Sequence, residues 1–368
     1  MTLYVSILSV AAVVAAAAAC VDAWRFLETW TGRIRIGRWR DRRAWQDALA
    51  RKASAWMKRM PPVPKKDQGR LVLWDMLRGA YADAAIQGWQ LAGLSLGLNA
   101  YAGDRNDGDL REKLRGALGS HELVVNYLER ENPGTWEVDR MLLDYAVLEA
   151  GCGVEERLVE KSLAFLESLK TEAGTLAYRR GQPAVRYVDT IGLACPLAAA
   201  CAARTGREED WNLAARQVEE YDAALLAGSS FPAHGFEMDR GYPLGLYDWS
   251  RGIGWYALGL CELYRLMEAH GRPEAGAMAK RIVSLSRELL PLRKRNGGFG
   301  WMVARPESVF ESSGTALMGV TRRSGALDMC QGDTKGIGMY SDVWGLMPFA
   351  QGMALRLSVE LNKEEGEG

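Results

Sequence analysis

The residues best suited to chemistry lie close together in the chain, between His234 and Leu260. Within this segment the run DWSRGIGW places Arg251 between two tryptophans, Trp249 and Trp255. The planar guanidinium of an arginine matches a carboxylate, and the apolar face of an indole matches the apolar face of a sugar ring. The segment therefore predicts a binding site for an acidic sugar.

Two glycines in the same run, Gly252 and Gly254, would let the backbone approach a ligand closely, because glycine has no Cβ. The run also fits a tight loop held by a structural ion pair between Arg251 and Asp248. The 13 tryptophans of the chain leave a similar choice, because they suit carbohydrate and equally suit the core of a helical protein.

Two aspartates outside this segment are candidates for acid–base work. Asp189 precedes Thr190 and an apolar helical stretch, and Asp139 begins another helix. Two carboxylates that converge on one pocket can shift each other's pKa towards the working pH. Taken alone, Asp189 also fits a helix N-cap, and Asp139 a solvated residue at a helix start. Which of these holds depends on the fold.

The elements that must position these residues are predicted to be helices. Apolar residues recur at helical spacing, and Pro, Gly and Asn-Pro-Gly interrupt the pattern. Helices are expected at 44–60, 76–101, 110–130, 138–150, 154–170, 189–205, 208–227, 250–270, 273–290, 311–322 and 341–361, with no convincing run of strands. Helices joined by short loops pack as antiparallel hairpins. We predict an all-α fold, the (α/α)6 toroid of six helical hairpins, although the periodicity also fits an open solenoid.

Four loops are longer than the others and carry Trp, Tyr, Arg and Gly. They are expected at 171–188, 228–249, 292–310 and 323–339. Long loops in compact domains are usually functional. Because these loops fall at alternate helix junctions, they would project from one end of the helical bundle, where we expect the site.

The motifs follow one another in the order of a known family. WSRGIGW resembles the W-x-RG-x-GW signature of glycoside hydrolase families 88 and 105, the unsaturated glucuronyl and rhamnogalacturonyl hydrolases. VDRMLLDYAVLEAG resembles the family helix with the first active-site aspartate, here Asp139. RYVDTIGLACPLAAACAARTG resembles the segment with the catalytic aspartate, here Asp189. HGFE and FESSGTALMGV resemble two further family segments, and the resemblance covers roughly residues 45–360.

This resemblance implies hydration of the C4=C5 double bond of an unsaturated uronic acid at the end of an oligosaccharide. Asp189 would give a proton to C4 while water adds at C5, and the resulting hemiketal would open and release the leaving sugar. Asp139 would stabilise the developing positive charge or orient the water. No metal or organic cofactor is required. The substrate-binding residues implied are His234, Trp249, Arg251, Trp255 and Tyr187.

The chain departs from the family pattern at two places. Tyr187 stands where the family often has a tryptophan, two positions before the catalytic aspartate. A histidine often found further upstream is replaced near Tyr178 and Arg179. These changes leave open which of the two families' substrates the chain prefers.

The N-terminal segment is the most apolar part of the chain. Leu3–Val21 carries no charge and no proline, and a run of about 20 apolar residues can span a bilayer core. Positive charge follows on its C-terminal side, which by the positive-inside rule predicts an anchor with a cytoplasmic enzyme domain. The arginines concerned are Arg25, Arg33, Arg35, Arg38, Arg40, Arg42 and Arg43. A signal segment, which would make the protein secreted or cell-surface, and an ordinary Ala-rich helix are the alternatives.

The domain boundaries follow from these patterns. Residues 1–22 are the hydrophobic segment, 23–43 a basic linker, 44–362 the barrel and 363–368 a charged tail. The formal net charge is +0, which gives no reason to expect nucleic acid as a partner. None of the 6 cysteines forms a CxxC pair, and no Cys/His cluster has the spacing of zinc ligands.

Two other functions fit parts of the sequence. The first is a different enzyme on the same fold, a conventional glycosidase or a polysaccharide lyase. It would use Glu237, Asp239 or Glu311 as acids, or Tyr242 as a base. The second is a non-catalytic, membrane-tethered sugar-binding protein, which the departures from the family pattern favour.

Overall fold

The computed structural model describes the chain in several stretches with gaps between them. They are residues 2–34, 41–61, 63, 72–78, 84–129, 138–226, 229–295, 297–318, 330–331, 340 and 344–366.

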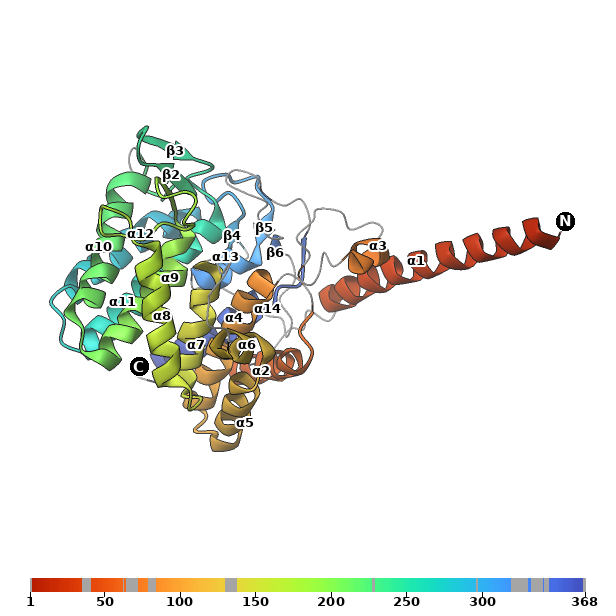
Figure 1. The fold of residues 1–368 in the computed structure, drawn as a ribbon, viewed down its shortest axis with the longest axis horizontal. Helices are drawn as coiled ribbons and strands as arrows, with labels where there is room; N and C mark the ends of the chain where they lie inside the picture. Colours follow the sequence, from red (N-terminus) through yellow and green to blue (C-terminus); the bar gives the residue numbers. More distant parts are fainter. Residues whose placement is uncertain are drawn as a thin grey trace.

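Six helices form a closed inner ring within this part of the chain. Each contacts the next, and the last returns to the first, in the order α4 (Ala84–Asp104), α7 (Met141–Ala150), α9 (Asp189–Thr205), α11 (Ser250–Ala269), α13 (Ser312–Leu317) and α14 (Pro348–Gly366). An open solenoid has no contact between its first and last repeats. The contact of α14 with α4 therefore decides for the toroid (Figure 1).

A second layer of helices packs on the outside of this ring. These are α2 (Arg42–Lys58) on α14 and α4, α5 (Gly108–Gly119) on α4 and α7, α8 (Glu155–Leu169) on α7 and α9, α10 (Glu208–Leu225) on α9, and α12 (Ala275–Leu289) on α11. The short α6 (Glu122–Glu129) lies between α5 and α8. The expected all-α fold of helical pairs is confirmed.

The sequence explains which helices are inside. From Thr190 to Ala202 every residue of α9 is buried, and these residues are mainly Ala, Leu, Cys and Gly. A helix that is apolar all round belongs in a core. In contrast, α12 buries only one stripe of residues, Ala275, Met278, Leu285 and Leu289, as an outer helix should.

Glycines set the closest approach within the ring. A Cβ atom added at Gly352 of α14 would lie 1.9 Å from the carbonyl oxygen of Gly93 in α4. One added at Gly97 would lie 2.1 Å from the carbonyl oxygen of Gly352. The two helices therefore meet backbone to backbone, which only glycine permits.

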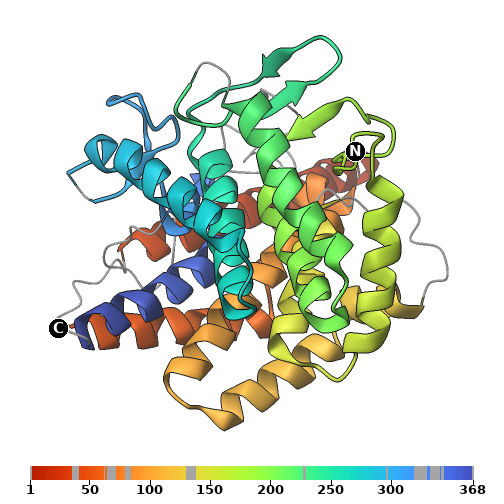
Figure 2. The same ribbon diagram turned by 90° about the vertical axis from the view of Figure 1, so that its left-hand side faces the viewer.

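The strands are short and lie in the long loops. β1 (Val185–Tyr187), β2 (Gly235–Glu237) and β3 (Tyr242–Leu244) form an antiparallel sheet in this order. This sheet stands over the ends of α9 and α10 (Figures 1 and 2). The pairs β4 (Phe299–Gly300) with β5 (Phe310–Glu311), and β6 (Cys330–Gln331) with β7 (Trp344–Gly345), are two-stranded. The sequence, which showed no convincing run of strands, gave no signal for these short strands.

Several expected helix boundaries also need correction. The helix expected at 110–130 is two helices, α5 and α6, with a break at Ser120 and His121. The helix expected at 341–361 begins only at Pro348, because β7 precedes it. α13 ends at Leu317, and the rest of its expected range from 319 onward lies outside the described residues. Most of the loop expected at 323–339 also lies outside them.

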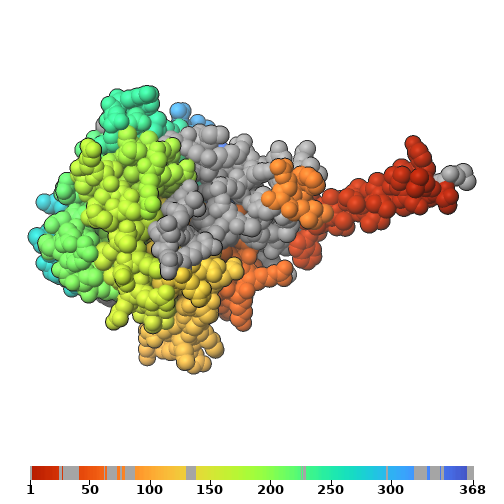
Figure 3. Space-filling view, in the orientation of Figure 1, coloured from red at the N-terminus to blue at the C-terminus, as the bar shows by residue number. Residues whose placement is uncertain are grey.

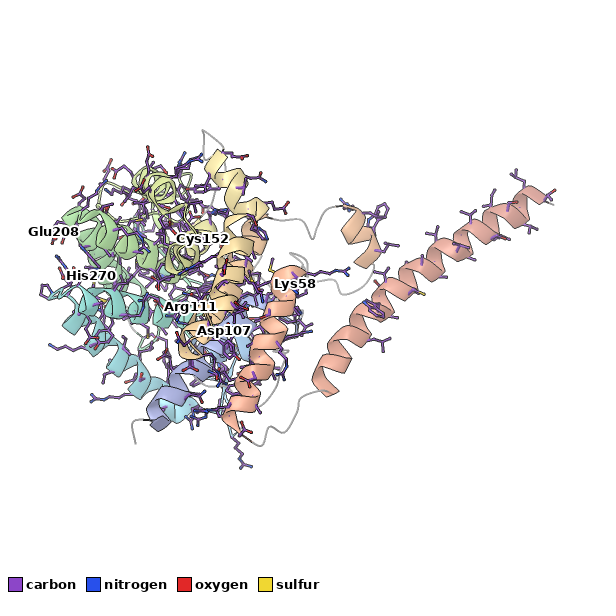
Figure 4. The ribbon with its side chains drawn as sticks, turned by 90° about the horizontal axis from the view of Figure 1, so that it is seen from below. Lys58, Asp107, Arg111, Cys152, Glu208 and His270 are labelled. Atoms are coloured by element: carbon purple, nitrogen blue, oxygen red, sulfur yellow. The ribbon has the colours of Figure 1, made fainter. Side chains whose placement is uncertain are left out.

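The N-terminal apolar segment forms a separate helix, α1 (Thr2–Ile34), which projects from the body of the molecule (Figure 3). It extends into the segment expected to be a linker. α3 (Val72–Leu77) contacts it. Seen from below, Lys58 at the end of α2 lies on the side of α1, while Glu208 and His270 lie on the opposite side (Figure 4).

Candidate active site

The candidate site lies where the first residues of three inner helices meet. A Cβ at Gly252 in α11 would touch Val188, which precedes α9, and one at Gly314 in α13 would touch Ser250 at the start of α11. The loops before these three helices include the first three of the four long loops that the sequence predicted. The described part of the chain thus gathers those loops at one end of the ring.

Asp189 is the first residue of α9, and it does not cap that helix. The N-cap is Val188, which makes no side-chain capping bond. The side chain of Asp189 is 16% exposed, and its Oδ2 lies 3.6 Å from Nε2 of His234. The carboxyl group therefore sits beside an imidazole at the end of the ring where α9 begins, with Oδ2 buried and part of the side chain accessible.

The three-stranded sheet brings His234 to Asp189. In the pairing of β1 with β2, Tyr187 lies opposite Gly235. The amide of Val188 then donates to the carbonyl of His234 at 2.9 Å. A histidine that directly precedes β2 is thus fixed beside an aspartate that follows β1 by two residues, although 45 positions separate them in the chain.

The imidazole of His234 is uncharged in this setting. Burial lowers its pKa to about 3, and the positive charge of Arg251 acts in the same direction. The 3.6 Å contact with Asp189 is therefore not an ion pair at neutral pH. Nδ1 of His234 has no hydrogen-bond partner among the described residues. A neutral imidazole can donate one hydrogen bond and accept another, which suits contact with sugar hydroxyls.

Trp249 and Arg251 line the inner wall behind His234. The ring of Trp249 lies 4.5 Å from that of His234, centroid to centroid. The guanidinium of Arg251 stacks over the Trp249 ring at 5.0 Å and donates to the carbonyl of Gln331 at 2.6 Å. Both side chains are only 2% exposed. Arg251 therefore acts on the site mainly through its charge and through the position of Trp249.

Two residues of this wall were not predicted from the sequence. Gln331 accepts a hydrogen bond from Nε1 of Trp249 at 3.2 Å. The ring of Tyr340 lies 5.6 Å from His234 and 5.4 Å from Trp249, and its hydroxyl accepts from the amide of Leu246. Burial raises the pKa of Tyr340 to about 12, helped by the charge of Asp189. Neither residue lies in a motif, so spacing alone gave no signal for them.

Asp139 reaches the same end of the ring through a different contact. It lies in the turn η1 (Val138–Arg140), which packs against α9 and leads into α7. Its Oδ2 accepts a hydrogen bond of 2.8 Å from the hydroxyl of Tyr178. The Tyr178 ring lies 4.7 Å from that of Tyr187, which in turn lies 5.8 Å from His234. Asp139 and Asp189 are therefore connected through a continuous row of side chains.

Trp255 is not part of this arrangement. Its indole is 3% exposed and packs against Phe349 at 4.7 Å and Trp89 at 5.7 Å inside the ring. The expectation that it flanks a sugar ring together with Trp249 is not what the structure shows. One helical turn and a half into α11, its side chain points into the core.

The two glycines of the WSRGIGW run also have a different role from the one expected. A Cβ at Gly252 would come within 2.7 Å of the Trp249 ring, and one at Gly254 within 2.6 Å of Leu317. Both residues lie in helical backbone of α11. They allow close packing of protein against protein, where the sequence suggested close approach to a ligand.

Glu311, an acid in one of the alternative functions, has a structural role. Its carboxylate is fully buried and caps α13 by accepting from the amides of Ser313 and Gly314. It also accepts from the amide of Gln331 at 3.1 Å. With its oxygens engaged in this way, Glu311 fixes β6 beside the start of α13. Among the described residues, no group of three or more His, Cys, Asp and Glu side chains could hold a metal ion.

Comparison with known protein families covers every resembled segment except the one that carries Asp139. A model of Glycosyl Hydrolase Family 88 matches residues 155–321. The resemblance to families 88 and 105 that the sequence predicted is confirmed. Among curated proteins, none matches the chain.

Solved structures share the fold at low sequence identity. A possible member of glycoside hydrolase family 105 from Salmonella enterica serovar Paratyphi A superposes with a TM-score of 0.67 at 16% identity, covering 87% of this chain and 94% of that one. The unsaturated glucuronyl hydrolase of Bacillus sp. GL1 gives 0.60 at 14%, covering 87% and 95%. A polysaccharide lyase gives 0.63 at 11%, covering 89% and 99%. These similarities confirm the (α/α)6 fold, and they do not separate a hydrolase from a lyase.

Proposed function

We propose that this protein is a glycoside hydrolase that releases a 4,5-unsaturated uronic acid from unsaturated oligosaccharides by hydration of the C4=C5 double bond. The observation that carries the proposal is the 3.6 Å contact of Asp189 with the neutral His234, at the end of the ring where α9 and α11 begin. The match to the family 88 model supports it, because residues 155–321 include both side chains.

In the proposed reaction Asp189 acts as the acid. Its carboxyl donates a proton to C4 of the unsaturated sugar, while water adds at C5 and gives up a proton. The hemiketal formed at C5 opens, which releases the remaining sugar with its hydroxyl restored. His234 holds a sugar hydroxyl without adding charge, because its low pKa keeps it neutral. The partial exposure of Asp189 allows substrate and water to reach it.

Asp139 is proposed to stabilise the positive charge that develops at C5. Charge stabilisation by groups already fixed in place is usually the largest contribution to catalysis. The hydrogen bond from Tyr178 fixes the carboxyl of Asp139 in this way. Tyr187, which is half-buried, supplies a ring face for the sugar, while the buried Trp249 supports the imidazole of His234. Arg251 supports Trp249 and adds positive charge for an anionic substrate.

The direct test of this proposal is a panel of unsaturated disaccharides. The conjugated double bond of the unsaturated uronate absorbs in the ultraviolet, and hydration removes it. We expect the absorbance to fall with the wild-type protein. A polysaccharide lyase would raise it, because elimination creates the double bond. Binding without any change across the panel would favour the sugar-binding alternative.

α1 is proposed to anchor the protein in a membrane with the barrel on the cytoplasmic side. Thr2–Trp24 is long and apolar enough to cross a bilayer, and none of its most apolar part is buried against the protein. The arginines that follow support the orientation. A signal sequence has the same length and composition, so a secreted or cell-surface protein is the alternative.

A further inference from the structure

Tyr178 contacts one of the two proposed catalytic carboxyl groups directly. It lies in the loop between α8 and α9, and its side chain is half-buried. Its hydroxyl donates to Oδ2 of Asp139 at 2.8 Å. A phenol that donates to a carboxylate fixes the orientation of the carboxylate and favours its charged form.

The backbone that carries Tyr178 is held firmly. The amide of Ala177 donates to the carbonyl of Leu169 at 2.9 Å. The side chain of Gln217, buried in α10, accepts from the amide of Leu176 at 2.7 Å and donates to its carbonyl at 3.3 Å. Tyr178 is therefore presented by an anchored turn, and its hydroxyl has a defined place.

The ring of Tyr178 also connects Asp139 with the other aspartate. It packs on Tyr187 with an interplanar angle of 36°. The edge of Tyr187 meets His234, whose Nε2 lies near Asp189. A movement of Tyr178 would thus disturb both carboxyl groups.

We propose that Tyr178 is a positioning residue that fixes Asp139 and holds it in a constant relation to Asp189. The inference rests on the proposed function, since it assigns a part in the same reaction. The resemblance implies that a histidine often found in the family is replaced near Tyr178 and Arg179, and histidine and tyrosine side chains can both donate a hydrogen bond. What this position requires is then a hydrogen-bond donor to the Asp139 carboxyl, and the type of ring that carries the donor matters less.

The test compares Tyr178→Phe with Tyr178→His in the full-length protein. Loss of the hydroxyl should lower kcat on the unsaturated disaccharide by about 10- to 100-fold, the range expected for a hydrogen bond to a charged group. KM should change little, because the ring remains. Tyr178→His should restore part of the lost kcat. The control is Tyr264→Phe, which removes a phenol that donates to Glu268 on exposed α11 surface and should leave both constants unchanged.

A wild-type kcat in Tyr178→Phe would overturn the inference. A loss of activity in both Tyr178 variants that is explained by a raised KM or a lower thermal stability would also overturn it.

A second measurement separates failure of this inference from failure of the proposed function. The pKa of the Asp139 carboxyl, followed by NMR, should be higher in Tyr178→Phe than in the wild type, whether or not any substrate turns over. Arg140, which follows Asp139 in the chain and pairs with Asp144, and Arg179, which lies over the Tyr178 ring, are the same in both proteins. An equal Asp139 pKa in both would refute the inference.

Discussion

At the residue scale, Asp189 and His234 are in contact but differ in their exposure to solvent. Asp189 is 16% exposed, while His234 is 2% exposed. A partly exposed carboxyl group can exchange protons with water, and a buried imidazole with a low pKa cannot readily accept one. This division makes Asp189 the acid and leaves His234 as a neutral partner for hydroxyl groups.

The low pKa of His234 predicts a pH dependence of stability. Below its ordinary pKa the unfolded chain binds a proton that the folded protein refuses until about pH 3. Folding free energy contributed by this group is therefore lost as pH falls, by about 1.4 kcal/mol per pH unit between the two pKa values. His234→Gln should lose less stability than the wild type between about pH 6 and about pH 4.5, a difference of roughly 2 kcal/mol. Urea unfolding at several pH values measures it, and parallel curves for the two proteins would contradict the assignment.

The residues also show what sequence could and could not predict. Asp139, Asp189, His234, Trp249, Arg251 and Tyr187 lie at one end of the ring, and motif order pointed to all of them. Trp249 and Trp255 belong to one motif, yet one faces His234 and the other faces Phe349. Which side of a helix faces the core depends on where the helix begins, and α11 begins between them, at Ser250.

At the scale of the elements, helices were predictable and short strands were not. The helix expected at 189–205 has those bounds, because an apolar Ala-rich run ends at a glycine with positive φ, Gly206. β1, β2 and β3 have three residues each, too few for an alternating pattern. This sheet nevertheless places His234 beside Asp189. The contact between His234 and Asp189 therefore depends on short strands that the sequence does not predict.

The contact of α4 with α14 closes the ring and predicts a large cost for added volume. Gly352→Ala would put a Cβ 1.9 Å from a backbone oxygen of α4, so the helices must move apart. We expect a loss of about 3 kcal/mol in the free energy of unfolding. Gly116→Ala in α5 is the matched control, because nothing lies within 4 Å of its added Cβ. That change should stabilise the protein by roughly 0.5–1 kcal/mol. Equal effects of the two substitutions in denaturant titrations would argue against this close approach.

At the scale of the whole molecule, the chain divides into a ring that carries the candidate site and a helix that projects from it. The apolar part of α1 does not pack against the ring, because 0% of it is buried. An apolar surface of that extent needs a lipid or protein environment. The ring, by contrast, has its own closed core.

Removal of residues 2–34 should therefore change location and leave chemistry intact. We expect the full-length protein in the membrane fraction and the truncated protein in the soluble fraction, with the same activity on unsaturated disaccharides. Protease added to intact cells should spare the ring if it lies in the cytoplasm. Digestion of the ring from outside would reverse the proposed orientation, and a full-length protein found only in the soluble fraction would remove the anchor.

Replacing the Asp189 carboxyl group tests whether this residue supplies the proton for hydration. Asp189→Asn keeps the shape of the side chain and removes its acid, so the fall in ultraviolet absorbance should slow by at least about 100-fold. Asp239→Asn is the matched control, because Asp239 is an exposed acid next to β2 and a candidate in the alternative enzymes. We expect only Asp189→Asn to be inactive, while both variants stay folded. Full activity of Asp189→Asn would contradict this expectation.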